Sequence, residues 1–178
     1  MIRWAPYANA FALIGLIACG CMPSGEPLTA GSEAPDFTAE SIDGHTLTRM
    51  LEQGPVVLVL LRGMGDRDGR EHLKRLVADI EQFRSRRATV AVVIREKGTT
   101  SLRLWRDLKY DNYMECFFDK PHKEIGKAYC QQWTLFASGL KPALFVISQE
   151  RKLIFAYYGS KASDIPDNQT VLNALDSI

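Results

Sequence analysis

The chain has 178 residues, which suits a single domain with a real hydrophobic core. Lys and Arg together number 22 against 21 for Asp and Glu, and no basic block stands apart, so the charges do not indicate a nucleic-acid partner. Apolar residues make up 46% of the chain, an ordinary fraction for a globular protein that argues against disorder.

The first residues predict an exported protein. Arg3 precedes an apolar stretch at residues 8–18, which is shorter than a membrane span of about 20 residues and typical of a signal-peptide core. Leu16-Ile17-Ala18-Cys19 resembles a bacterial lipobox, in which the cysteine is lipidated and becomes the new N-terminus. Cys21 is a second candidate for the lipid, and a plain secretory signal or an uncleaved anchor are the alternatives.

We therefore expect residues 1–18 to be a lipoprotein signal peptide, residues 19–32 a lipidated N-terminus with a flexible tether, and residues 33–178 the folded domain. The tether contains Pro, Gly and Ser and has no apolar period. Acyl chains on Cys19 would hold the protein to a bilayer, because each buried CH₂ contributes roughly 0.8 kcal/mol. The expected location is a bacterial cell envelope, on its periplasmic or outer-surface face.

The domain is predicted to open with a short hairpin, from Phe37-Thr38-Ala39 and Thr46-Leu47, followed by a helical turn that ends at Gly54-Pro55. The apolar run Val56–Leu61 predicts a buried strand. A helix beginning near Arg70 follows, since its apolar residues recur at three- and four-residue spacing. These residues are Leu73, Leu76, Val77, Ile80 and Phe83.

The rest of the chain alternates strands and helices before the order changes. The pattern predicts a strand at 89–94, a helix at 99–108, a strand at 115–118 and a helix with Pro121 in its first turn. Strands at 143–147 and 153–158 then form an antiparallel hairpin, and a helix around Val171, Leu172 and Leu175 closes the chain. This order predicts an α/β, thioredoxin-like three-layer sandwich, with a central mixed sheet and helices on both faces.

Four segments in the right order resemble one known family over about residues 31–178. They are Gly31-Ser32-Glu33-Ala34-Pro35-Asp36-Phe37 with Asp43-Gly44-His45-Thr46-Leu47, then Arg62-Gly63, Phe118-Asp119-Lys120-Pro121 with Ala128-Tyr129, and Lys141-Pro142-Ala143-Leu144-Phe145-Val146-Ile147. The chain resembles the peroxiredoxin (alkyl hydroperoxide reductase/thiol-specific antioxidant) family, in its peroxiredoxin-like branch. The resemblance implies the thioredoxin-like fold and a site in the turn after the strand at 56–61.

That turn departs from the family pattern. Aligning the family's "R-G-x-x-C-P-x-C" turn with residues 62–69 places Asp66 at the peroxide-attacking cysteine and Gly69 at the second cysteine. Val59 and Gly63 stand at the positions of the usual peroxiredoxin proline and threonine. Helix N-terminal amides lower the pKa of a thiol, but this turn contains no cysteine. Whether the protein is an enzyme is therefore open.

The polar side chains of the turn have two interpretations each. Asp66 and Asp68 are either helix caps, the simpler interpretation, or carboxylates of a surviving site. Arg62 is the cation that the family would use to polarise peroxide and stabilise a thiolate. Without a nucleophile to serve, we favour the alternative, in which Arg62 pairs with Asp66 or Asp68 or simply ends the strand in solvent. Pro142 resembles the family's cis-proline beside a docking groove, and it also sets the entry of a strand.

Cys116 and Cys130 are the thiols outside the signal region. Cys116 lies in an apolar strand and is expected to pack in the core, whereas Cys130 ends the following helix and is the better candidate for a reactive thiol. A disulfide between them needs the helix end to curl back, because packed layers are about 10 Å apart. Asp68 and His72 are four residues apart but have no third metal ligand, so we expect no metal and no cofactor.

The predicted function is binding or scaffolding at the cell envelope, through a groove around Asp66, Arg62 and Pro142. The partners would be the bilayer, through Cys19, and a protein or small-molecule ligand at the groove. The alternative is a thiol-dependent antioxidant oxidoreductase that reduces peroxide or disulfides through Cys130 or Cys116, with an outside dithiol as reductant.

Overall fold

The computed structural model describes residues 26–95, 99–119, 124–134 and 139–178. The expected signal peptide, Cys19, Cys21, Pro121 and His122 lie outside these described residues. Within the described ranges, no helix has both the length and the apolar composition needed to cross a membrane.

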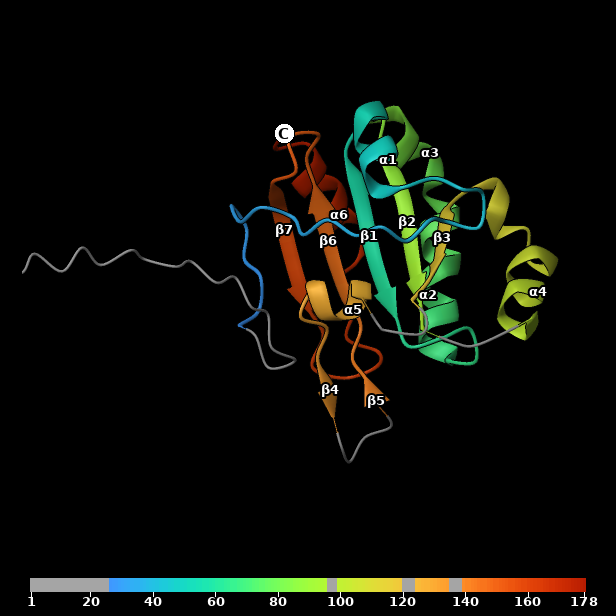
Figure 1. Cartoon of the computed structure of the whole chain (residues 1–178). Helices are drawn as coiled ribbons and strands as arrows, with labels where there is room; N and C mark the ends of the chain where they lie inside the picture. The colour runs from blue at the N-terminus through green and yellow to red at the C-terminus, as the bar shows by residue number, and fades with distance from the viewer. Residues whose placement is uncertain (1–25, 96–98, 120–123, 135–138) are drawn as a thin grey trace, which may run out of the picture.

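A five-stranded mixed sheet forms the centre of the domain (Figure 1). The strand order is β3-β2-β1-β6-β7, with β1 parallel to β2, β2 parallel to β3, and antiparallel pairs β1–β6 and β6–β7. The strands are β1 (Val56–Leu61), β2 (Thr89–Ile94), β3 (Glu115–Phe118), β6 (Ala143–Ile147) and β7 (Leu153–Tyr158). All five strands of this sheet were predicted from the sequence, and the C-terminal hairpin is confirmed.

The central strand β1 is buried on both faces, which explains its continuous apolar run. Alternate residues belong to two separate core clusters: Val57, Val59 and Leu61 on one face, and Val56, Leu58 and Leu60 on the other. Burying a side chain of this kind contributes about 1.5–3 kcal/mol. The strand therefore fixes the end of the sheet where the chain turns at Arg62.

Helices cover both faces, as the predicted three-layer sandwich requires (Figure 1). One face packs against α2 (Arg67–Ala78), α3 (Ile80–Ser85), α4 (Thr99–Asp107) and α6 (Asn168–Leu175). The other face packs against α1 (Leu47–Gln53) and α5 (Glu124–Ala128), together with Ala34 and Phe37 from the N-terminal segment. The thioredoxin-like α/β fold is confirmed.

Two local predictions are wrong. The expected hairpin around Phe37 and Leu47 does not form, because Leu47 starts α1 instead and the hydroxyl of Thr46 accepts the Arg49 N–H at 3.2 Å. The helix after the turn starts at Arg67 and is interrupted at Asp79, where α2 gives way to α3. The Asp79 carboxylate accepts a bond from Asn168 of α6 at 2.7 Å, a tertiary contact that no local pattern contains.

Two short elements were not predicted: the 3₁₀ turn η1 (Tyr110–Asn112) and a separate small hairpin of β4 (Trp133–Thr134) and β5 (Gly139–Leu140). Two-residue strands are too short to show an alternating pattern. Figure 1 shows the β4–β5 hairpin projecting from the body of the domain, beyond the C-terminal end of β1. We call this end of the sheet, where β1 and β7 finish, the site end.

Candidate functional site

The turn after β1 leads into the first turn of α2, as expected for the site. Asp66 is the N-cap residue of α2, with an extended backbone (φ −75°, ψ 124°), and its carbonyl oxygen accepts the Arg70 N–H at 3.1 Å. Residue 66 therefore lies at a helix start, the place where helix dipoles favour a negative charge.

The side chain of Asp66 makes an ion pair in place of a capping bond. No helix N–H donates to its carboxylate, so the prediction of a capping hydrogen bond from the Asp66 side chain is wrong. Arg62 instead donates from Nη2 to Oδ1 at 2.8 Å and from Nε to Oδ2 at 3.3 Å, which confirms the expected ion pair. The side chains are only 23% and 13% exposed, and the bond to Asp66 raises the pKa of Arg62. A two-point, charge-assisted bond to arginine is stronger than a bond to a neutral amide.

Gly69 lies one helical turn after Asp66 and faces it. A Cβ atom placed on Gly69 would lie 3.5 Å from Asp66 Oδ2 and 3.7 Å from the Gly63 carbonyl oxygen, both ordinary van der Waals distances. Residues 66 and 69 therefore share one face of the helix start, with room for a small side chain at position 69. Arg62, Asp66 and Gly69 form one cluster, which we call the turn cluster.

The sheet register brings Pro142 to the same end of the molecule. Leu60 of β1 pairs with Ala143 of β6, so the residues that follow Leu60 and those that precede Ala143 leave the sheet side by side. The amide of Gln131 bridges the two segments: its Nε2 lies 2.9 Å from the Lys141 carbonyl oxygen and 3.5 Å from that of Leu60. Pro142 itself is buried. No sequence pattern assigned a role to Gln131, because its partners are backbone atoms of distant segments.

Comparison with known proteins identifies the family. Residues 30–156, well over half of the chain, match the AhpC/TSA family. The chain belongs to the AhpC/TSA family. This result confirms the resemblance drawn from the four sequence segments. Among curated proteins, no match to this AhpC/TSA chain is found.

Solved structures show the same fold. The peroxidoxin BcpB from Mycobacterium tuberculosis has a TM-score of 0.72 at 17% identity, over 85% of this chain and 98% of that chain. A peroxiredoxin-like protein from Aquifex aeolicus has a TM-score of 0.70 at 15% identity, over 86% and 90%. The thiol peroxidase from Chromobacterium violaceum has a TM-score of 0.67 at 13% identity, over 86% and 89%. At these identities the likeness shows the fold alone.

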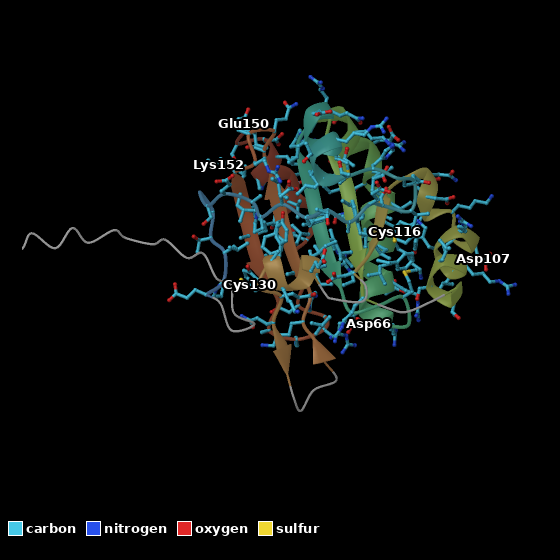
Figure 2. The ribbon with its side chains drawn as sticks, in the orientation of Figure 1. Asp66, Asp107, Cys116, Cys130, Glu150 and Lys152 are labelled. Carbon is cyan, nitrogen blue, oxygen red and sulfur yellow. The ribbon has the colours of Figure 1, made fainter. Side chains whose placement is uncertain are left out.

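The two described cysteines of this AhpC/TSA chain differ in accessibility, and they do not form a disulfide with each other. Cys116 in β3 is 1% exposed, and burial raises the pKa of its thiol far above the usual range, so it is a poor nucleophile at neutral pH. Cys130 is partly buried and lies in the turn two residues after α5 ends, with a left-handed backbone (φ 51°). Figure 2 shows Cys130 and Asp66 toward the site end, with Cys116 further along the sheet.

Asp119 binds the first turn of α5, the short helix that precedes Cys130. Its two carboxylate oxygens accept the N–H groups of Ile125 at 3.1 Å and Gly126 at 2.8 Å. Asp119 as a residue is 7% exposed, so these bonds replace the hydration that its buried carboxylate loses. In the sequence Asp119 is recognisable only as part of a segment that resembles the family, because the N–H groups that it binds lie six and seven residues further along the chain.

The histidine of α2 is a core residue. His72 is fully buried, its Nε2 has no hydrogen-bond partner, and burial together with the charge of Arg75 lowers its pKa to about 3. Asp68 remains partly exposed on the same helix. Across the part of the chain that the structure describes, no group of three or more His, Cys, Asp or Glu side chains could hold a metal ion.

One hollow on the surface lies away from the turn cluster. It has a volume of about 230 Å³ and includes Arg84, Tyr113 and Glu115 in its lining. It also includes Thr89, where β2 begins, which places it at the end of the sheet opposite the site end. This hollow contains none of the residues expected to form the site.

Proposed function

We propose that this protein acts by binding a protein or small-molecule ligand at the site end, without thiol peroxidase chemistry in the turn cluster. The family resemblance places Asp66 and Gly69 where the two cysteines of an active member stand. A carboxylate cannot be oxidised to a sulfenic acid, the first product of a peroxidatic thiol. The redox step would then be lost at this position.

The two-point bond between Arg62 and Asp66 is the observation that carries the proposal. This bond occupies the guanidinium of Arg62, the group that the resemblance would use to polarise peroxide. Both side chains are largely buried. The pair also ties the end of β1 to the start of α2, so the turn stays ordered without a thiol. A ligand would meet this rigid turn and the neighbouring segment at Pro142.

The rival function is a thiol-dependent oxidoreductase, and one observation favours Cys130 for it. Cys130 is partly exposed and precedes Gln131, which bonds to the segment before Pro142. Cys116 is the weaker candidate because it is buried in β3. An enzyme of this kind would reduce a peroxide or a disulfide at the expense of an outside dithiol.

A peroxide-consumption assay with an added dithiol separates the two functions. We expect no turnover above background from the wild-type protein, and the same result from Cys130→Ser and Cys116→Ser. Turnover that Cys130→Ser abolishes and Cys116→Ser leaves intact would establish the rival function.

The proposal includes a lipid anchor at Cys19, supported by the lipobox at residues 16–19. Intact mass and peptide mapping of protein taken from native membranes test this part separately. We expect a mature chain that starts at Cys19 and carries acyl groups. A mature N-terminus at another residue, or an unmodified Cys19, would contradict the anchor and leave the prediction about peroxidase activity standing.

A further inference from the structure

The hollow at the end of the sheet opposite the site end has the features of a second binding site. It has a volume of about 230 Å³ and lies between α3, the start of β2 and the segment that runs from η1 into β3. Figure 1 shows α3 and the start of β2 at the end of the sheet away from α5. A cavity of about 150 Å³ holds one benzene ring, so this hollow has room for a body of that size together with a polar group.

The floor of the hollow is apolar. Four of its lining residues belong to the hydrophobic core and are at most 6% exposed: Ile80, Ala88, Val90 and Met114. Ligand pockets combine an apolar lining of this kind with a few polar groups that orient the ligand. The floor therefore suits the apolar part of a small molecule, whose burial there stabilises the complex.

Arg84 ties the rim of the hollow together. Its Nη2 donates to the Asn112 carbonyl oxygen at 2.9 Å, 28 residues further along the chain. Its guanidinium carbon lies 5.8 Å from the centre of the Tyr113 ring, a cation–π contact. These two contacts join α3 to η1 and the residue after it, so the shape of the rim is fixed within the folded chain.

The charged side chains leave an excess of negative charge at the hollow. Arg84 donates from Nη1 to Glu81 Oε1 at 2.7 Å, so a carboxylate already balances its charge. Asp111 lines the hollow, is exposed, and forms no ion pair with another residue that the structure describes. Glu115 also lines the hollow, with its Oε1 at 2.9 Å from His45 Nδ1. Glu115 Oε2 is buried and has no hydrogen-bond partner among the described residues, which is unfavourable for a carboxylate oxygen.

We propose that this hollow binds a small organic ammonium ion, a primary amine with a short branched or aromatic apolar body. The ammonium group bonds to the carboxylates of Asp111 and Glu115, and the apolar body lies on the floor beside Met114. The site shares no residue with the turn cluster. It therefore stands independently of the proposed function, of the lipid anchor and of the loss of peroxidase chemistry.

Three compounds with the same branched carbon chain test the charge of the ligand. Isoamylamine is a cation, leucine carries both charges, and isocaproate is an anion. Each compound is titrated into the full chain at neutral pH and low salt. Calorimetry measures the affinity, and NMR shifts of backbone amides locate the site.

We expect isoamylamine to bind with a dissociation constant on the order of 1 mM, as suits a ligand of so few atoms. Leucine should bind several-fold more weakly, and isocaproate should not bind. The amide shifts caused by isoamylamine should centre on Ala88, Thr89 and Asn112, which line the hollow.

Asp111→Asn should weaken isoamylamine binding by roughly fivefold, because a charge-assisted bond becomes a neutral one. The matched control is Asp107→Asn, which changes the protein's charge equally. Asp107 is an exposed residue of α4 that does not line the hollow, and Figure 2 labels it on that helix. The control should bind like the wild type. Ala88→Leu should abolish binding, because the added carbon atoms fill the hollow.

The absence of heat and of amide shifts with isoamylamine, at concentrations well above the millimolar range, would overturn the site. Tighter binding of leucine or isocaproate would overturn the assignment of the ligand as a cation. Equal weakening by Asp111→Asn and Asp107→Asn would overturn the contact with Asp111, because it would show only an effect of net charge. Shifts at Asp66 and Gly69 in place of the hollow would overturn this inference and support the proposed function.

Discussion

The guanidinium of Arg62 binds both carboxylate oxygens of Asp66, with Nη2 to Oδ1 at 2.8 Å and Nε to Oδ2 at 3.3 Å. This pair joins the residue that follows β1 to the N-cap residue of α2. The family resemblance implies a thiolate beside a cation in this same turn. The same local charges that would activate sulfur here stabilise an oxygen acid. The structural and redox uses of the turn can be separated by substitution.

The first prediction concerns the strength of this pair. Arg62→Met and Asp66→Asn, made singly and together, should show a coupling free energy of about 1–2 kcal/mol in urea unfolding, between the values for exposed and buried pairs. The matched control is the Glu71–Lys74 pair of α2, whose side chains are 52% and 60% exposed, and its coupling should be smaller. Equal coupling free energies for the two pairs would show that the partly buried Arg62–Asp66 pair is no stronger than the exposed pair.

Asp66→Cys should produce a reactive thiol. Residue 66 lies at the start of a twelve-residue helix and next to Arg62, so the pKa of the new thiol should fall below the ordinary value of about 8.5. The pH dependence of alkylation, measured in a Cys130→Ser background, reports this pKa. Ser85→Cys, at the last residue of α3, is the control and should not be lowered. An ordinary pKa at position 66 would argue against an inherited thiolate site.

His72 should make the protein acid-sensitive. Burial lowers its pKa to about 3 in the folded state, whereas the unfolded chain binds the proton below about 6.5. The unfolded state therefore holds more protons between these two values, and stability falls as the pH falls through this window, by up to about 1.4 kcal/mol per pH unit.

His72→Leu should remove that dependence, because leucine has no proton to bind and no unpaired Nε2 to bury. Urea unfolding at pH 7 and pH 5 measures the difference. The control His45→Gln, whose histidine side chain is 34% exposed in its pair with Glu115, should keep the slope that His72 causes. A slope that survives in His72→Leu would show that another group is responsible.

Asp119→Ala should destabilise the fold by about 1–3 kcal/mol, because two N–H groups in the first turn of α5 lose the carboxylate oxygens that accept from them. The exposed Asp111 in η1 provides the control, Asp111→Ala, and should have a much smaller effect. Denaturant unfolding gives both values. Faster hydrogen exchange at Ile125 and Gly126 would locate the loss in α5, and unchanged exchange there would contradict the capping role.

Most of the fold could be predicted because the apolar periodicity of a helix or strand is visible within a short stretch of sequence. The continuous apolar run of β1 and the three- and four-residue spacing in α2 are properties of short stretches, and each formed the predicted type of element. Some of the errors occurred where a tertiary contact competed with the local pattern. Asn168 bonds to Asp79 between α2 and α3, and the two-residue strands β4 and β5 are defined by their backbone pairing with each other.

By itself, the sequence determined the order of the elements, the family, and the lack of a cysteine between Arg62 and Arg70, because periodicity and residue identity are carried by the chain. Only the tertiary structure decided that Asp66 bonds to Arg62 and not to the amides of α2, and that Gln131 lies between Leu60 and Lys141. Both alternatives for Asp66 were within reach along the chain, whereas the Leu60 partner of Gln131 comes from a distant segment. The packing of the folded chain determines which donors and acceptors lie close together away from water, and so which hydrogen bonds form.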